Sequence, residues 1–240
     1  EADAKKVKTA RHTLAKTDLY GSRVTVHQFD AADIPYSNYF ANLIVSDRFV
    51  KEGELGVDVA KISRHLKPLG GILCLGQPDG NNVPATQTAL KAAIGRGGLS
   101  AEEAVIESGN GLVTLKRGPL PGAGNWSHQY GNPGNTAISD ERRVKGGLGV
   151  LWYGDPGPGD MVNRHDGAVG PLATAGRLYV QGESTIRAYD AYNGLFLWNY
   201  DNPGAIRTGV YKNVSPGNLA ASDERLFHFV GKECFELDAA

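Results

Sequence analysis

Hydrophobic positions follow helical and strand periods in turn over the first 117 residues. Ala4, Val7 and Leu14 recur at the spacing of one helix face, and the apolar runs ANLIVS and GILCL are typical of buried strands. The predicted elements, in chain order, are helices over 4–14, 57–66 and 86–94 and strands over 24–29, 41–46, 71–75, 104–106 and 112–116. This alternation, closed by two adjacent strands, predicts an α/β sheet that ends in an antiparallel hairpin.

Helical periodicity stops at the Pro/Gly-rich segment GPLPGAG. Beyond it, short apolar runs are separated by Gly, Pro, Asn and Asp, as an all-β region requires. The predicted strands of this half cover 148–153, 170–174, 177–181, 185–190, 195–200, 218–222, 225–229 and 233–237. We therefore expect an α/β domain over 1–117, a linker over 118–125 and an all-β region over 126–240.

The run AYDAYNGLFLW (188–198) carries the strongest local pattern of the all-β half. Asp190 precedes a turn and is expected to accept hydrogen bonds from its N–H groups, while Gly194 supplies a positive φ. Phe196 and Trp198 are expected to point inward, with the Trp198 indole buried between its own sheet and the next.

The same pattern returns at an offset of 48 residues, since Leu178 and Asp190 are matched by Leu226 and Asp238. A period of ~40–50 residues is typical of propeller blades. The run and its period resemble the blade signature of quinoprotein-like β-propellers, and WSHQYGNPGNT resembles the segment that leads into their first blade. Such propellers close with ~4–8 blades. The resemblance covers one full blade and part of another, so we expect a fragment of a longer protein.

The first half resembles the second half of class I methyltransferases that use S-adenosylmethionine. The resemblance is carried by the ordered stretches EADAKKVKTARHTL, VTVHQFDAADIPY, ANLIVSD and VAKISRHLKPLGGILCLG. It implies that Glu1 accepts both ribose hydroxyls of the cofactor, because one carboxylate accepts two hydrogen bonds. It also implies that Asp30 accepts from the adenine amino group beside the N–H of Ala31, with Asp33 as the alternative, and that Asp47 faces the substrate. A frayed terminal charge, a turn cap and a loop charge are the other interpretations of the three acids Glu1, Asp30 and Asp47.

One part of the methyltransferase pattern is missing from this sequence. The Gly-rich turn after the first strand, whose backbone approaches the methionine part of the cofactor, has no counterpart. The glycines of 95–98 follow a predicted helix and indicate its end, and the glycines of 154–159 precede no helix. We therefore expect this chain by itself to bind S-adenosylmethionine poorly.

Quinoprotein-like propellers fall into two groups by their chemistry. One group binds pyrroloquinoline quinone (PQQ) and Ca²⁺ and oxidises alcohols, and the other, which includes BamB-like outer-membrane assembly lipoproteins, has the blades without a cofactor. The sequence lacks the Cys-Cys pair often found beside the quinone, and Asn163–Asp166 is its one concentrated polar cluster in this half. We therefore expect neither PQQ nor Ca²⁺, and we expect the propeller to bind a protein partner.

Composition narrows the range of partners. The net charge of −1 gives no basic footprint for nucleic acid, and no apolar run reaches the ~18 residues of a membrane span. Our leading interpretation is a bacterial protein that joins a methyltransferase-like domain, active or degenerate, to a cofactor-free propeller serving as a binding or assembly scaffold. The alternatives are an active S-adenosylmethionine-dependent methyltransferase and a quinone-dependent dehydrogenase. An active methyltransferase would favour the cytoplasm, and a dominant propeller the periplasm or export.

Overall fold

A computed structural model describes residues 1–77, 83–96, 99–100, 102–154, 166–167, 170–182, 185–201, 208–209, 219–230 and 232–240. The chain divides into two compact units. The first unit comprises residues 1–66 and 71–116, and the second comprises residues 67–70 and 117–240. The expected linker over 118–125 thus falls within the second unit, and its Leu120 is buried.

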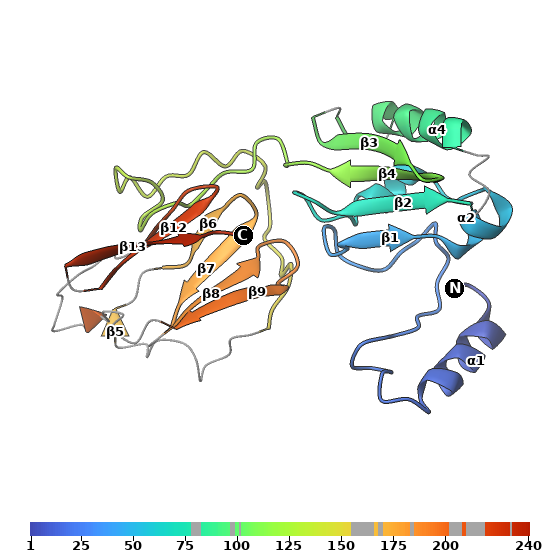
Figure 1. Ribbon diagram of the computed structural model, residues 1–240, viewed down its shortest axis with the longest axis horizontal. Coiled ribbons are helices and arrows are strands. Elements are labelled where there is room, and N and C mark those ends of the chain that lie inside the picture. Colours follow the sequence, from blue (N-terminus) through green and yellow to red (C-terminus); the bar gives the residue numbers. More distant parts are fainter. Residues whose placement is uncertain are drawn as a thin grey trace. The chain divides into compact units, whose positions relative to one another are not determined.

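The first unit is built on a mixed sheet with helices (Figure 1). Its elements are α1 (Ala4–Leu14), β1 (Leu43–Val45), α2 (Asp47–Glu52), α3 (Val59–Ser63), β2 (Ile72–Gly76), α4 (Val83–Arg96), β3 (Ala104–Gly109) and β4 (Leu112–Arg117). The strands lie in the order β1-β2-β4-β3. Strands β1 and β2 are parallel, and β2 and β4 are antiparallel. Strand β4, the second strand of the predicted hairpin, therefore lies between β2 and its hairpin partner β3.

Local side chains define where the helices of this unit begin and end. Asp3 caps α1, because its Oδ1 accepts from the N–H of Lys5 at 2.7 Å. Ser46 caps α2 in the same way, and Gly53 ends that helix in the left-handed conformation with a φ of 71°. The sequence reading missed α2, a short helix that follows directly on β1.

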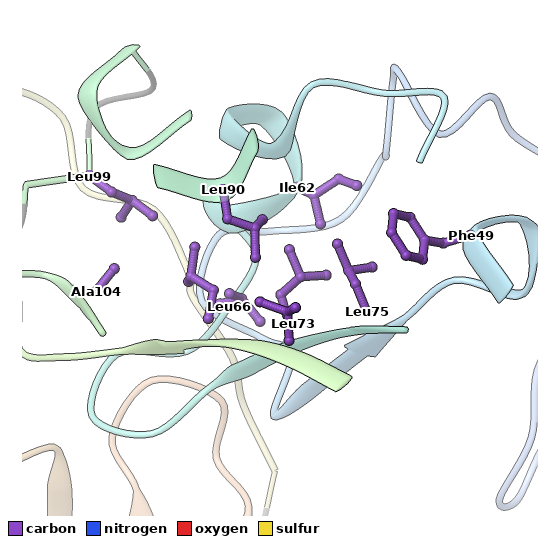
Figure 2. Close-up of a cluster of buried hydrophobic side chains, with 10 residues drawn as sticks. Phe49, Ile62, Leu66, Leu73, Leu75, Leu90, Leu99 and Ala104 are labelled. Atoms are coloured by element: carbon purple, nitrogen blue, oxygen red, sulfur yellow. The ribbon is translucent and has the colours of Figure 1, made fainter. Parts of the chain in front are cut away.

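The core of the first unit lies on one face of its sheet. The buried side chains that form it are Phe49, Ile62, Leu66, Leu73, Leu75, Leu90, Leu99, Ala104, Val113 and Leu115. Figure 2 shows Leu90 of α4 and Ile62 of α3 on the side of the sheet to which Leu73 and Leu75 of β2 point. The alternation of strand residues produces this one-sided burial, since Ile72 and Cys74 lie on the opposite face and stay partly exposed.

The described part of the second unit contains two larger antiparallel sheets. One contains β6 (Leu172–Thr174), β7 (Arg177–Gln181), β8 (Thr185–Asp190) and β9 (Phe196–Asp201) in that order. The other contains β11 (Leu219–Ala221), β12 (Arg225–Val230) and β13 (Glu233–Asp238). Two short strands, β5 (Asp166–Gly167) and β10 (Thr208–Gly209), pair separately. The two larger sheets confirm the predicted strands that correspond to β6–β9 and β11–β13, while the propeller arrangement stays a prediction.

The two sheets repeat one another in register. Arg177 of β7 pairs with Asp190 of β8, and 48 residues later Arg225 of β12 pairs with Asp238 of β13. The segment that contains Trp126 contacts both copies: Trp126 bridges Ala173, and the N–H of Ala221 donates to the carbonyl of Ser127 at 2.9 Å. Ala173 and Ala221 are themselves 48 residues apart, so this segment binds the same position of each copy.

The run 188–198 folds largely as its sequence predicts. The Asp190 Oδ1 accepts from the backbone N–H groups of Tyr192 at 2.9 Å and Asn193 at 3.2 Å. Gly194 has a φ of 72°, as its place in the turn requires. Trp198 is partly buried against the core shared by both sheets, and its Nε1 donates to the Ala239 carbonyl at 3.4 Å. The predicted contact of this indole with its own sheet and the next is confirmed.

Phe196 corrects the prediction that it points inward, because it is 48% exposed. A register shift between Ala188 and Tyr189 places Phe196 opposite Tyr189 and Trp198 opposite Ala188. Successive residues of β8 point to opposite faces, so the irregularity separates two side chains that simple alternation would put on one face.

Two predicted strands are absent. Residues 24–29 form no strand, because the backbone there bonds elsewhere: the Val26 carbonyl accepts from the Arg11 side chain, and the Phe29 N–H donates to the Glu1 carbonyl. Residues 148–153 also form none, and Leu148 and Val150 are 84% and 81% exposed. Three glycines in and just before this run remove the side chains that would pack a strand against a neighbour.

Candidate functional site

The parallel pair β1 and β2 ends at one edge of the first unit's sheet. Ligands of open α/β sheets bind outside the carboxyl ends of such strands. A pocket of about 630 Å³ opens beside Leu75, near the end of β2. Its other walls are Phe49 of α2, the loop and helix start 53–59, and Ala85, Thr86, Ala89 and Leu90 of α4. We call this space the apolar pocket, because most of its wall is made of hydrocarbon side chains.

Acidic side chains stand on the loop that forms one wall of the apolar pocket. Glu54 and Asp58 both line it and are both exposed. Asp58 also caps α3, with its Oδ1 accepting from the Ala60 N–H at 3.0 Å. The Arg48 guanidinium lies against Gly56 of the same loop and is paired with Glu52 at 2.8 Å.

A second cavity, of about 590 Å³, has a polar wall. We call it the Ala31 cavity, since it includes one of the predicted site residues. It is lined by Ala31, Ala32, Asp33, Ile34, Ala60, Lys61, Arg64 and His65. The loop 31–34 forms one side, and α3 with the two residues that follow it forms the other.

His65 is a buried residue of the Ala31 cavity wall, and its two ring nitrogens make hydrogen bonds that hold neighbouring groups of this wall in place. Its Nδ1 donates to the Ser37 carbonyl at 2.9 Å, so its Nε2 is free to accept from the Arg64 Nε at 3.1 Å. Burial lowers the pKa of His65 below its ordinary value of 6.5; the Arg64 charge lowers it further, while the Ser37 bond opposes both. Neutral His65 thus orients Arg64, whose Nη2 donates to the Ile34 carbonyl at 3.3 Å.

The structure places three predicted cofactor residues close together in the chain fold. The Glu1 carbonyl accepts from the N–H of Phe29, the residue before Asp30. The Glu1 Oε1 accepts from the Asp3 N–H at 3.0 Å, and the Asp30 Oδ1 accepts from the Ala32 N–H at 2.8 Å. Both carboxylates thus brace local turns, and each keeps a second oxygen. Ala31 lines the Ala31 cavity.

Asp47, the fourth predicted site residue, belongs to neither cavity wall as described. It is the first residue of α2, at the edge of the sheet where β1 ends, and its negative charge stabilises the N-terminus of that helix. Its Oδ2 pairs with Lys51 at 2.6 Å on an exposed surface. The position agrees with the expected edge of the sheet, and the substrate-facing role of Asp47 stays a prediction.

Sequence reasoning missed the Arg64–His65 pair and the apolar pocket. His65 lies within the predicted helix over 57–66, and a polar side chain that is buried is itself a signal of a specific hydrogen bond. The pocket had no signal of this kind. Its walls come from α2, a loop, β2 and α4, and only folding brings them together.

The second unit gives less evidence for chemistry. The polar cluster 163–166 lies outside the residues whose side chains the structure describes, as do most of 154–159 and Gly97–Gly98. Within the described ranges, no group of three or more His, Cys, Asp or Glu side chains could hold a metal ion. Over the same ranges, none of the helices has the length and apolar character needed to cross a membrane.

Comparison with known proteins yields one weak similarity. No protein-family model matches the chain, and no curated protein matches it. The chain is similar to the crystal structure of a candidate S-adenosyl-L-methionine-dependent methyltransferase from Methanococcus maripaludis, with 20% sequence identity and a TM-score of 0.36. The similarity covers 47% of this chain, which spans 62% of the length of the other. The mixed sheet with helices confirms the α/β class that the sequence predicts for the first half.

Proposed function

We propose that the first unit is a methyltransferase-like domain that binds the adenine end of S-adenosylmethionine at the Ala31 cavity. One observation carries this proposal. Within the described residues, the Oδ2 of Asp30 and the N–H of Ala31 make no hydrogen bond. An acceptor and a donor on adjacent residues match the amino group and a ring nitrogen of adenine.

Two other predicted residues, Glu1 and Asp47, have proposed roles toward the ribose and the substrate. The second oxygen of Glu1 is the acceptor proposed for the ribose, because Glu1 is held beside Phe29 by its own carbonyl. Asp47 remains the residue proposed to face a substrate from the carboxyl edge of β1. An active methyltransferase must bind the cofactor, so a domain that does not bind it is degenerate.

Isothermal titration of S-adenosylmethionine into the full-length gene product tests the proposal. Asp30→Ala should weaken binding by about 1–3 kcal/mol, the scale of a lost hydrogen bond to a charged group. Asp33→Ala is the comparison variant, because Asp33 lines the Ala31 cavity, whereas the preferred adenine partner Asp30 directly precedes the lining residues. A larger loss of affinity for Asp33→Ala than for Asp30→Ala would assign the adenine contact to Asp33. If the unsubstituted protein does not bind S-adenosylmethionine, the domain is degenerate.

We further propose that the second unit is a cofactor-free scaffold for a protein partner. Its support is the exposure of large apolar side chains at Leu148, Val150 and Tyr153, because clustered apolar surface marks interaction sites. The competing function, a quinone-dependent dehydrogenase, makes a different prediction. Adding PQQ with Ca²⁺ should leave the unfolding midpoint unchanged for a scaffold, whereas a dehydrogenase would be stabilised by mass action.

A further inference from the structure

The apolar pocket has a floor made by the core of the first unit. Phe49, Leu75, Leu90 and Thr86 line it and are all buried. Figure 2 shows Phe49 beside Leu75, with Leu90 farther along the same side of the sheet. These hydrocarbon groups are already fixed by packing, so a ligand entering the pocket meets a preformed surface. Preformed pockets of this size, within ~300–1,000 Å³, accept drug-sized molecules.

The wall above this floor carries negative charge. Glu54 makes no hydrogen bond or ion pair to any described residue, and Asp58 uses one oxygen to cap α3 and keeps the other. Arg48 adds no net positive charge, because it is paired with Glu52. The described lining includes no lysine, arginine or histidine. A ligand in the pocket therefore faces two uncompensated carboxylates.

From this combination we infer that the apolar pocket binds a small amphiphilic cation, an amine with an aryl or alkyl tail. The tail occupies the space between Leu75, Leu90 and Ala89, and the ammonium group stays at the loop near Glu54 and Asp58. Transfer of the tail from water contributes about 0.8 kcal/mol for each buried CH₂ group. The carboxylates select against anions, since a phosphate or carboxylate ligand would be repelled at the same place.

This inference goes beyond the proposed function and does not depend on it. The apolar pocket and the Ala31 cavity share no residue among their described linings. Amine binding is measured without S-adenosylmethionine, so a failure of cofactor binding and a failure of amine binding are separate results.

Three probes of matched size separate charge from tail: phenethylamine, phenethyl alcohol and phenylacetate. Binding is followed by chemical-shift changes of Leu and Val methyl groups in the whole chain, at low salt. Phenethylamine should bind most tightly, the neutral alcohol more weakly and phenylacetate weakest. Raising the salt should reduce the advantage of the amine over the alcohol, because exposed charges are screened.

Charge variants test the two carboxylates. Glu54→Gln and Asp58→Asn should each lower the affinity for phenethylamine by about twofold to fivefold and leave the alcohol unchanged, as expected for partly exposed ion pairs. Asparagine retains the capping of α3. Asp18→Asn is the matched control, because Asp18 is an exposed acid of the same unit outside the pocket.

A blocking variant tests the place. Ala89→Phe puts a ring into the pocket from an exposed position of α4, and Ala85→Phe does so one turn earlier. Either should abolish binding of all three probes while circular dichroism shows the unit still folded. The inference is overturned if phenylacetate binds as tightly as phenethylamine, if phenethylamine does not bind, or if both folded blocking variants bind it unchanged.

Discussion

Asp190 and Asp238 hold the same place in the two copies of the repeat, at the end of the second strand of each hairpin. Each pairs with an arginine across its hairpin in the backbone register, Arg177 and Arg225 respectively. Each also accepts a hydrogen bond from the N–H two residues later, at 2.9 Å in both copies. The first hydrogen bond after each aspartate is therefore the same.

Their surroundings differ. The Asp190 side chain is 5% exposed and pairs with Lys67, one of the four residues 67–70 that belong to the second unit. The Asp238 side chain is 71% exposed and pairs with Arg225 at 3.2 Å. One motif thus produces a buried ion pair in the first copy and a solvated one in the second. The difference teaches that a repeat fixes the backbone and its turns, while neighbours outside the repeat set the energy of each side chain.

The largest expected effect is a difference in the free energy of unfolding between alanine variants of Asp190 and Asp238. Asp190→Ala should lower the free energy of unfolding by about 3–5 kcal/mol, because it leaves the largely buried Lys67 without its partner. Asp238→Ala should cost far less, because water already surrounds its carboxylate. Urea denaturation of both variants measures the difference. Asp190→Asn keeps the acceptor of the turn and isolates the charge; equal losses in the two alanine variants would contradict the comparison.

Trp198 joins the two copies, and its removal tests that link. Its ring lies 6.0 Å from that of Tyr179 in its own sheet, and its Nε1 reaches Ala239 after the last strand of the other. Trp198→Ala should cost about 3 kcal/mol, the low end for a core aromatic, because the ring is only partly buried. Trp198→Phe should recover most of this loss. Thermal unfolding checks both, and a neutral Trp198→Ala would show that the sheets are held together without the indole.

Gly194 tests how tightly the first turn is covered. An added Cβ would lie 2.4 Å from the Trp152 ring, and the residue already has a φ of 72°. Gly194→Ala should therefore cost about 2–3 kcal/mol, the sum of backbone strain and overpacking. Gly146→Ala has a similar φ of 83° with open space around it, so it measures the strain alone. Equal losses at both sites, by urea denaturation, would show that Trp152 does not cover the turn.

The smallest expected effect is on the pH dependence of stability. It comes from His228, which occupies the position equivalent to Val180, 48 residues earlier. His228 is buried and stacks on Phe235 at 5.0 Å, and burial lowers its pKa below the ordinary 6.5. The unfolded chain then binds the proton more tightly than the folded one. Its contribution is present above about pH 6.5 and is lost as the pH falls through that value toward the lower folded pKa.

His228→Val makes the second copy resemble the first and should flatten this loss of stability on acidification. Unfolding free energies between about pH 5 and 7.5 provide the measurement. A residual slope of the same sign is expected from His65, whose pKa is also lowered by burial. An unchanged slope in the variant would mean that His228 does not titrate as a buried neutral group.

The pattern of the sequence predicted most strands and helices where elements are local. Strands β6–β9 and β11–β13 follow alternation and turn residues, and α1, α4 and the β3–β4 hairpin follow their periods and the Asn110-Gly111 turn. Residues 24–29 have strand-like side chains, but a strand needs a neighbour, and here Arg11 of α1 and the Glu1 carbonyl take backbone bonds instead.

The candidate site was predicted less well for the same reason. Asp30 and Ala31 were named from their place in an ordered set of motifs, and Ala31 does reach a cavity. The Arg64–His65 pair depends on the Ser37 carbonyl, 28 residues away in the chain, and no local pattern links them. The apolar pocket is assembled from four segments, so no single stretch of sequence marks it.

By itself, the sequence determined the change from an α/β half to an all-β half and the 48-residue repeat with its turn acceptors, because periodicity, capping and turn chemistry act between residues near in the chain. Only the tertiary structure decided which equivalent side chains are buried, that Lys67 meets Asp190 across 123 residues, and where the two cavities lie. Burial and ion pairing depend on which distant segments fold together, and that choice is made by the packing of the whole unit.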